Sequence, residues 1–157
     1  MWTLVTAILA TIGALIGLWL TWLKLPPKLC IEGTVDKSKK FNSESKIKIK
    51  NIGKLSAINV KADVENLCAG WDSVQMENCG FQDFPNVIGS LPSDESTEIS
   101  VRPHITFEQG KQMTKFSYIL TLKYQVKILL FKIRCSRKWK IELRRFEDGY
   151  TWEVTNI

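Results

Sequence analysis

The first 23 residues form one apolar run. Met1–Leu23 contains no charged side chain, and Lys24 is the first charge in the chain. A helix of this length extends about 34 Å at 1.5 Å per residue, against the roughly 30 Å that the hydrocarbon core of a bilayer requires. Trp2 at one end, with Trp19 and Trp22 at the other, occupy positions where aromatic rings settle at headgroup depth. The pattern predicts a transmembrane helix over residues 1–23.

The residues after this run predict its orientation. A cleaved signal peptide is disfavoured because the run is long, no basic segment precedes it, and "TWLKLPP" has no small-residue cleavage site. Lys24 and Lys28 flank a double proline that ends the helix, so residues 24–28 form a junction. Lys and Arg are enriched on the cytoplasmic side of membrane helices. We therefore expect a protein of the inner (plasma) membrane, with its N-terminus outside and the remaining chain in the cytoplasm.

Small residues recur on one face of the expected helix. Ala10, Gly13, Ala14 and Gly17 are spaced by three and four positions, which aligns them along one side. The G-x-x-x-G pair allows two helix backbones to approach closely in lipid. Glycine and alanine are also common in membrane helices in general, so helix–helix packing and plain composition both remain open.

From residue 29 onward, apolar and polar residues alternate with a period of two. In "SKIKIKNIG", Ile47 and Ile49 share one face, and in "SAINVKADV" residues 58, 60, 62 and 64 share a phase. With "KLCIEGTV", "STEISVRP" and "GYTWEV", these runs predict about seven or eight strands, separated by a loop-rich stretch at 66–92. The expected fold class is all-β, an antiparallel β-sandwich over residues 29–157. Whether the first two runs pair within one sheet or across two sheets remains open.

The strongest strand pattern lies in the last third of the chain. "KFSYILTLKY" alternates from Phe116 to Tyr124, and "FKIRCSRKWKIELRR" alternates from Phe131 to Leu143. The apolar phase of the second run, which includes Cys135, is expected to point inward. Its opposite phase is basic and forms the predicted basic face, made of Lys132, Arg134, Lys138, Lys140 and Arg144.

Charge is distributed in three blocks. Residues 24–61 carry ten Lys and three acids, residues 62–98 carry eight acids and no Lys or Arg, and residues 99–157 carry twelve Lys or Arg and five acids. The basic face has three readings: a solvated surface, contact with anionic lipid headgroups, or contact with an acidic partner. A partner protein or a second copy, whose acidic block would meet this face, is expected. Nucleic acid is disfavoured because its binders expose aromatic residues among the charges, whereas Phe131 and Trp139 take the inward phase.

The cysteines and the histidine give no catalytic or metal pattern. Cys68 and Cys79 would close a small disulfide loop in an oxidising compartment, whereas a cytoplasmic location favours free thiols. The four cysteines include no C-x-x-C pair, and His104 is the single histidine. Neither a metal site nor a cofactor is therefore expected, and the chain has no phosphate-binding glycine loop or nucleophile motif that would indicate an enzyme.

The segment "IKIKNIGKLSAINVKADV" resembles the strand–turn–strand core of Ig-like sandwiches of the CARDB-like type. Small single-pass bacterial membrane proteins similarly combine an anchor, a proline-lysine junction and such a sandwich. The resemblance implies a binding or scaffolding module without catalytic residues. We therefore expect a membrane-anchored interaction or scaffold module, acting as an accessory subunit of a membrane complex. The alternative is an oligomerising membrane effector, of the defence or toxin type, whose soluble domain senses a ligand or partner.

Overall fold

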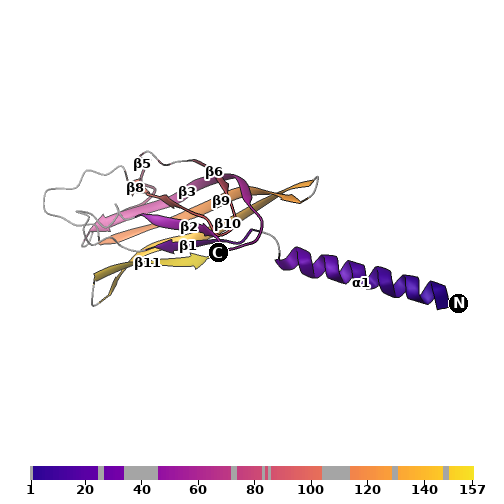
Figure 1. Cartoon of the computed structure of the whole chain (residues 1–157). Helices are drawn as coiled ribbons and strands as arrows, with labels where there is room; N and C mark the ends of the chain where they lie inside the picture. The colour runs from indigo at the N-terminus through magenta and orange to yellow at the C-terminus, as the bar shows by residue number, and fades with distance from the viewer. Residues whose placement is uncertain are drawn as a thin grey trace.

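Helix α1, at Trp2–Lys24, projects from one end of an all-β domain (Figure 1). The computed structural model describes residues 2–24, 27–33, 46–71, 74–82, 84, 86–103, 114–128, 131–146 and 149–157. Over these residues, no helix has the length and apolarity needed to cross a membrane. Large apolar side chains of α1 are exposed, and those described are Ile8, Ile12, Leu15, Ile16, Leu18 and Trp19.

Two antiparallel sheets face each other and form a β-sandwich (Figure 1). The smaller sheet has the order β1-β2-β7, with β1 at Leu29–Gly33, β2 at Ile47–Asn51 and β7 at Ser96–Ile99. The larger sheet has the order β11-β10-β9-β3-β4, and β6 also pairs with β3. Its strands are β3 at Ala57–Trp71, β4 at Val74–Met76, β6 at Val87–Leu91, β9 at Lys115–Ile128, β10 at Phe131–Phe146 and β11 at Gly149–Asn156. Strands β5 at Phe81–Gln82 and β8 at Arg102–Pro103 form a separate pair. The prediction of an all-β antiparallel fold is confirmed.

The core lies between the two sheets and confirms most of the predicted strand phases. Ile47 and Ile49 of β2 are 1% and 0% exposed, and Ile99 of β7 is also buried. These residues belong to one apolar cluster with the inward phase of the larger sheet. The members from β9 and β10 are Phe116, Tyr118, Leu120, Leu122, Tyr124, Val126, Trp139, Ile141 and Leu143. The first two sequence runs therefore pair across the sandwich, since β2 and β3 belong to different sheets.

Strand β3 departs from the predicted phase because it contains two bulges. Asn59 and Asn66 both have a φ of 52°, and the register of β3 against β9 shifts at each position. The shift at Asn59 makes Ala57, rather than Ile58, the buried residue before Val60. The prediction that Ile58 shares the inward phase is therefore wrong. The strand continues through Trp71, into the stretch expected to be loop-rich.

The hairpin of β9 and β10 corrects a second prediction. Phe131, expected to point inward, is 72% exposed. In the same phase, Ile133 and Cys135 are half-buried, and Cys135 packs against the core cluster. Burial in this phase is complete at Trp139, which lies opposite Leu120 of β9. Alternation fixes which face a side chain takes, whereas the opposing sheet determines whether that face is covered.

Asn51 joins the smaller sheet to the larger one at one end of the sandwich. Its Nδ2 donates to the carbonyl of Leu55 at 2.8 Å and to that of Leu91 at 3.0 Å. Its Oδ1 accepts from the N–H of Gly53 at 3.0 Å, and Asn51 is 0% exposed. The turn residue Asp94 donates its N–H to the Asn51 carbonyl at 2.8 Å. Asn51, the last residue of β2, therefore forms a buried hydrogen-bond hub.

Three aromatic rings close the sandwich beside β1. Phe116, Tyr118 and Trp152 pack edge to face, with ring centroids 5.4 to 6.4 Å apart. A Cβ added to Gly33 would lie 2.7 Å from the Cβ of Trp152. Strand β1 therefore packs so close to β11 that only glycine fits at this position.

Candidate interaction face

The outward-facing residues of β3, β9 and β10 form a surface that we call the outer face. On β10 it includes the five residues of the predicted basic face, and all five side chains are exposed. Residues of β9 and β3 extend it through directly paired positions, such as Lys138 opposite Thr121 and Thr121 opposite Asp63. The five residues therefore lie in the exposed phase of β10.

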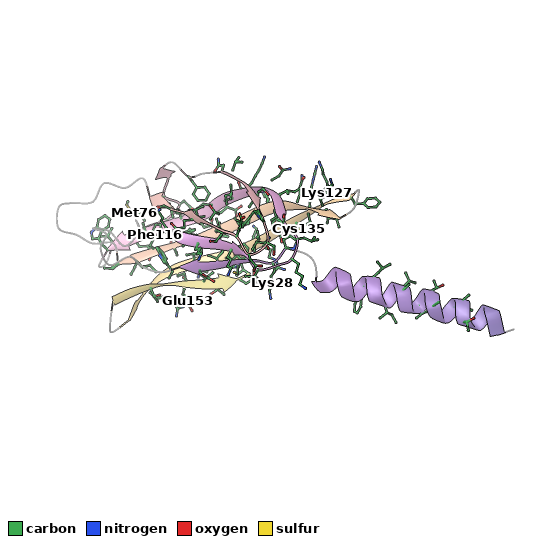
Figure 2. All side chains as sticks on the ribbon, in the orientation of Figure 1. Lys28, Met76, Phe116, Lys127, Cys135 and Glu153 are labelled. Carbon is green, nitrogen blue, oxygen red and sulfur yellow. The ribbon has the colours of Figure 1, made fainter. Side chains whose placement is uncertain are left out.

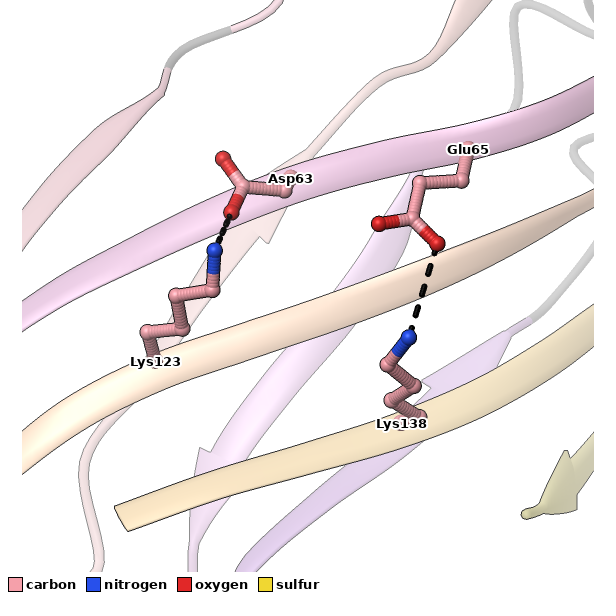
Figure 3. A network of polar contacts seen from close by, with 4 residues as sticks. All are labelled: Asp63, Glu65, Lys123 and Lys138. Atoms are coloured by element: carbon pink, nitrogen blue, oxygen red, sulfur yellow. Dashed lines mark hydrogen bonds and ion pairs between the residues drawn. The ribbon is translucent and has the colours of Figure 1, made fainter. Parts of the chain in front are cut away.

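Ion pairs divide this face into two parts. Lys138 Nζ lies 3.5 Å from the Glu65 carboxylate, and Lys123 Nζ lies 2.6 Å from that of Asp63 (Figure 3). The Asp63 carboxylate accepts a hydrogen bond from Lys123 and so raises the pKa of that amine. Asp63 and Glu65 belong to the acidic block at residues 62–98, and these ion pairs place them beside the basic residues on one sheet. The alternation of apolar and polar residues alone does not predict which acid lies beside which base.

Two further basic residues of β10 are paired with acids beside them. Lys140 Nζ lies 2.9 Å from a carboxylate oxygen of Glu142, and Arg144 pairs with Glu142 and with Glu153 of β11. All of these side chains retain solvent exposure, so each pair contributes little to stability. Their effect is electrostatic: over this half of the face, the cations are balanced by carboxylates.

The basic residues nearer the β9–β10 turn carry no ion pair within the described part of the chain. They are Lys61 of β3, Lys127 of β9, and Lys132 and Arg134 of β10. All four side chains are exposed. The positive charge predicted for the whole basic face is therefore concentrated at one end of it.

A groove of about 750 Å³ lies within this unbalanced region, and we call it the basic groove. Cationic and hydrogen-bonding side chains from β3, β9 and β10 line it beside Val87 and Gly89 of β6. Two of its lining residues are joined by a hydrogen bond, in which Asn59 Nδ2 donates to Gln125 Oε1 at 3.1 Å. Because the Asp63 carboxylate balances Lys123, the net charge of the groove comes from Lys61 and Arg134. Its polar lining consists of Asn59, Lys61, Lys123, Gln125, Arg134 and Ser136.

The sequence reasoning identified Arg134 but missed Lys61, Asn59 and Gln125. Lys61 lies in the polar phase of "NVKADV", which was visible in the sequence. Its position opposite Lys123 follows from the bulge at Asn59, and no pattern of hydrophobic residues reports such a bulge. The groove is thus built by a local backbone irregularity.

All four cysteines are free thiols. Cys68 lines a smaller hollow with Ser117 and Glu142, while Cys79 packs against the core cluster. The backbone N–H of Cys79 donates to the Leu67 carbonyl at 2.8 Å, so Cys68 and Cys79 lie on neighbouring backbone segments. Because both thiols are free, the structure does not contain the Cys68–Cys79 disulfide that their spacing allowed. Burial raises the pKa of the thiols of Cys30 and Cys135.

The residues singled out in the apolar helix lie on α1 or next to it. Ala10, Gly13, Ala14 and Gly17 are exposed, and a Cβ added to either glycine would contact nothing within 4 Å. Trp19 is 62% exposed, and Lys28 is exposed just before β1. The side chains of Trp2, Trp22 and Lys24 lie outside the described set, as does His104 with its surroundings.

The chain matches no protein-family model and has no significant match among curated proteins. Among the described residues, no group of three or more His, Cys, Asp or Glu side chains is placed to hold a metal ion. The outer face itself offers exposed cations, amide groups and a groove.

Proposed function

We propose that this chain is a membrane-anchored, Ig-like β-sandwich that binds a protein partner through the basic groove, as an accessory subunit of a membrane complex. The observation that carries this proposal is the combination of an exposed apolar helix with a sandwich whose unbalanced cations gather in one groove. The partner surface that fits is acidic, because carboxylates would accept hydrogen bonds from Lys61 and Arg134.

The anchor is argued from the complete sequence of α1, including side chains outside the described set. No charge occurs before Lys24, and the described large apolar side chains of α1 are left exposed. Leaving six large apolar side chains in water is costly, at roughly 1.5–3 kcal/mol for each. Lipid would remove that cost, which supports insertion of the helix.

The orientation is argued from the lysines that follow the helix. Five lysines lie within about 20 residues of its C-terminal end, namely Lys24, Lys28, Lys37, Lys39 and Lys40. Lysines close to a membrane helix favour the cytoplasmic side. We infer that the N-terminus lies outside and that the sandwich lies in the cytoplasm of a cell with an inner membrane.

Fractionation and protease protection test the anchor and its orientation. The full chain, with an epitope tag after the exposed Ile157, should stay in the pellet after alkaline carbonate extraction. The tag should resist protease in intact cells and be cleaved after permeabilisation. Lys24→Glu with Lys28→Glu should increase the protease-sensitive fraction. Release into the supernatant would overturn the anchor, and cleavage in intact cells would overturn the orientation.

Partner capture tests the groove. The variant Lys61→Glu with Arg134→Glu should lose a co-purifying membrane partner in mild detergent, because two attractive contacts become repulsive. The control is Lys48→Glu with Lys54→Glu, which makes the same charge change at exposed residues outside the groove. Equal capture by both variants would overturn the groove as the binding site. Loss of membrane potential on expression would instead favour the oligomerising effector.

A further inference from the structure

The turn between β9 and β10 presents an aromatic ring to solvent. Phe131 is 72% exposed, more than any other large apolar side chain in the described part of the chain. It lies opposite Ile128 in the β9–β10 register. In the sequence, residues 128–131 read "ILLF". Hairpin connections in water normally carry Gly, Asn or Asp, and the sequence between β9 and β10 contains none of these.

Two lysines flank this apolar run at directly paired positions. Lys127 lies opposite Lys132, and both side chains are exposed. Like charges directly opposite each other destabilise a strand pair, and no ion pair in the described part of the chain offsets this one. An anionic surface would remove the repulsion. We call the three residues Lys127, Phe131 and Lys132 the hairpin tip.

The hairpin tip lies at the end of the sandwich from which α1 emerges. The carbonyl of Lys28 accepts a hydrogen bond from the residue after Asn51, and Asn51 bonds Leu91. Leu91 and Val126 both lie opposite Ala57, so they mark the same level of the larger sheet. The hairpin continues beyond that level to its tip. Figure 2 shows Lys28 and Lys127 toward α1 and Met76 at the far end of the domain.

We propose that the hairpin tip is a second membrane contact, which places Phe131 among the headgroups and Lys127 and Lys132 against anionic lipid. The occupant is a bilayer because an apolar ring flanked by two cations matches an acyl boundary under anionic phosphates. The junction supports this choice. From Lys24 to Leu29 the chain spans at most about 17 Å, so a bilayer holding α1 would lie beside the tip.

This contact rests on the proposed anchor, and it fixes an additional property. A single helix followed by a short junction would leave the sandwich free to tilt. A second contact at the tip would hold the domain end-on, with the basic groove directed sideways along the membrane. The anionic headgroups would favour the contact by about fivefold for each lysine.

Photo-cross-linking of the full chain in vesicles tests the inference. Phe131 is replaced by p-benzoylphenylalanine, and the protein is reconstituted with a fluorescent phosphatidylglycerol. The control carries the same residue in place of Met76, which is 36% exposed at the far end. Irradiation should attach lipid at position 131 and not at position 76. Equal attachment at both positions, or none at position 131, would overturn the inference.

Charge variants test the lysines separately. In the photo-reactive protein, Lys127→Gln with Lys132→Gln should lower lipid attachment at position 131 by up to about 25-fold in anionic vesicles. Lys138→Gln with Lys140→Gln removes the same charge from the ion-paired half of the face and should leave attachment unchanged. Equal losses in the two variants would overturn the role of the tip lysines. Carbonate extraction of the same proteins reports on α1 alone, so failure of the anchor and failure of the tip are distinguishable.

Discussion

Asn51 is a residue whose importance the sequence conceals. Read from the pattern, it ends a strand before a glycine turn, yet it donates two hydrogen bonds and accepts one in a fully buried site. An asparagine before a turn is usually exposed, so composition and period do not separate the two cases. Only the approach of Leu91 from another strand makes the amide indispensable.

Replacing Asn51 should therefore destabilise the sandwich. Asn51→Ala leaves the carbonyls of Leu55 and Leu91 and the N–H of Gly53 without this partner, at a cost of about 3 kcal/mol or more. Asn51→Asp keeps the shape but replaces the donor by an acceptor, so it should also destabilise. Urea unfolding followed by far-UV circular dichroism measures both changes. The exposed Asn156→Ala is the control, and a similar loss there would contradict the hub.

Tyr118 makes the fold sensitive to alkaline conditions. Burial raises the pKa of its hydroxyl, whereas a tyrosine in an unfolded chain titrates near pH 10. Above about pH 10 the unfolded chain releases a proton that the folded chain retains, so the free energy of unfolding falls as pH rises. Tyr118→Phe should move the alkaline unfolding midpoint upward, as measured by circular dichroism between about pH 9 and 12. Tyr124→Phe should have a smaller effect, since hydrogen bonding to Arg137 opposes the pKa rise at Tyr124.

Strand β3 shows how far the sequence predicts an element. The alternation in "NVKADV" predicts a strand correctly and places Val60 and Ala62 inward. It does not report the left-handed residues Asn59 and Asn66, which shift the phase of the strand. Asparagine tolerates this conformation better than most residues, but it occurs far more often without it. The basic groove follows from the first of these bulges, so its lining could not be predicted.

The bulge at Asn66 gives a conformational prediction. With a φ of 52°, this residue should be replaceable by glycine with little loss, because glycine adopts the same conformation freely. Asn66→Val should cost about 1–2 kcal/mol, since a β-branched side chain is strained there. The urea midpoints of the two variants measure the difference. Equal midpoints would show that the backbone relaxes out of the bulge.

The β9–β10 hairpin shows that alternation predicts the direction of a side chain but not its burial. The sequence predicts alternating apolar and polar residues along the whole hairpin. The apolar residues of this alternation from Phe116 to Tyr124 are buried as expected. Phe131 has the same inward phase but extends past the part of the sandwich that covers Trp139. Period records the direction of a side chain, while coverage depends on the opposite sheet. With Phe131 exposed, one argument against nucleic acid is removed, although we still propose an acidic partner and lipid as the binders of the clustered cations.

Assembly of the whole molecule is tested through α1. If its small-residue face packs against a second helix, Gly13→Ile with Gly17→Ile should lower dimer formation in membranes by about tenfold, because the added branches separate the backbones. Chemical cross-linking at several expression levels measures this. Ile12→Ala with Leu15→Ala changes side-chain size on the opposite face and should leave dimers intact. Cross-linking that stays the same in the glycine variant would contradict packing through this face.

The hydrogen bond from the Ile52 N–H to the Lys28 carbonyl limits how far the sandwich can move away from α1. It fixes the chain to the sandwich only four residues after α1 ends. The linker from Lys24 to Lys28 therefore spans at most roughly 14 Å. With α1 in a bilayer, the domain would sample only a thin layer next to the membrane. A partner confined to the same layer would meet it at an effective concentration in the millimolar range, as for a short linker. A freely diffusing partner would gain nothing, so even weak contacts at the groove would select neighbours in the membrane.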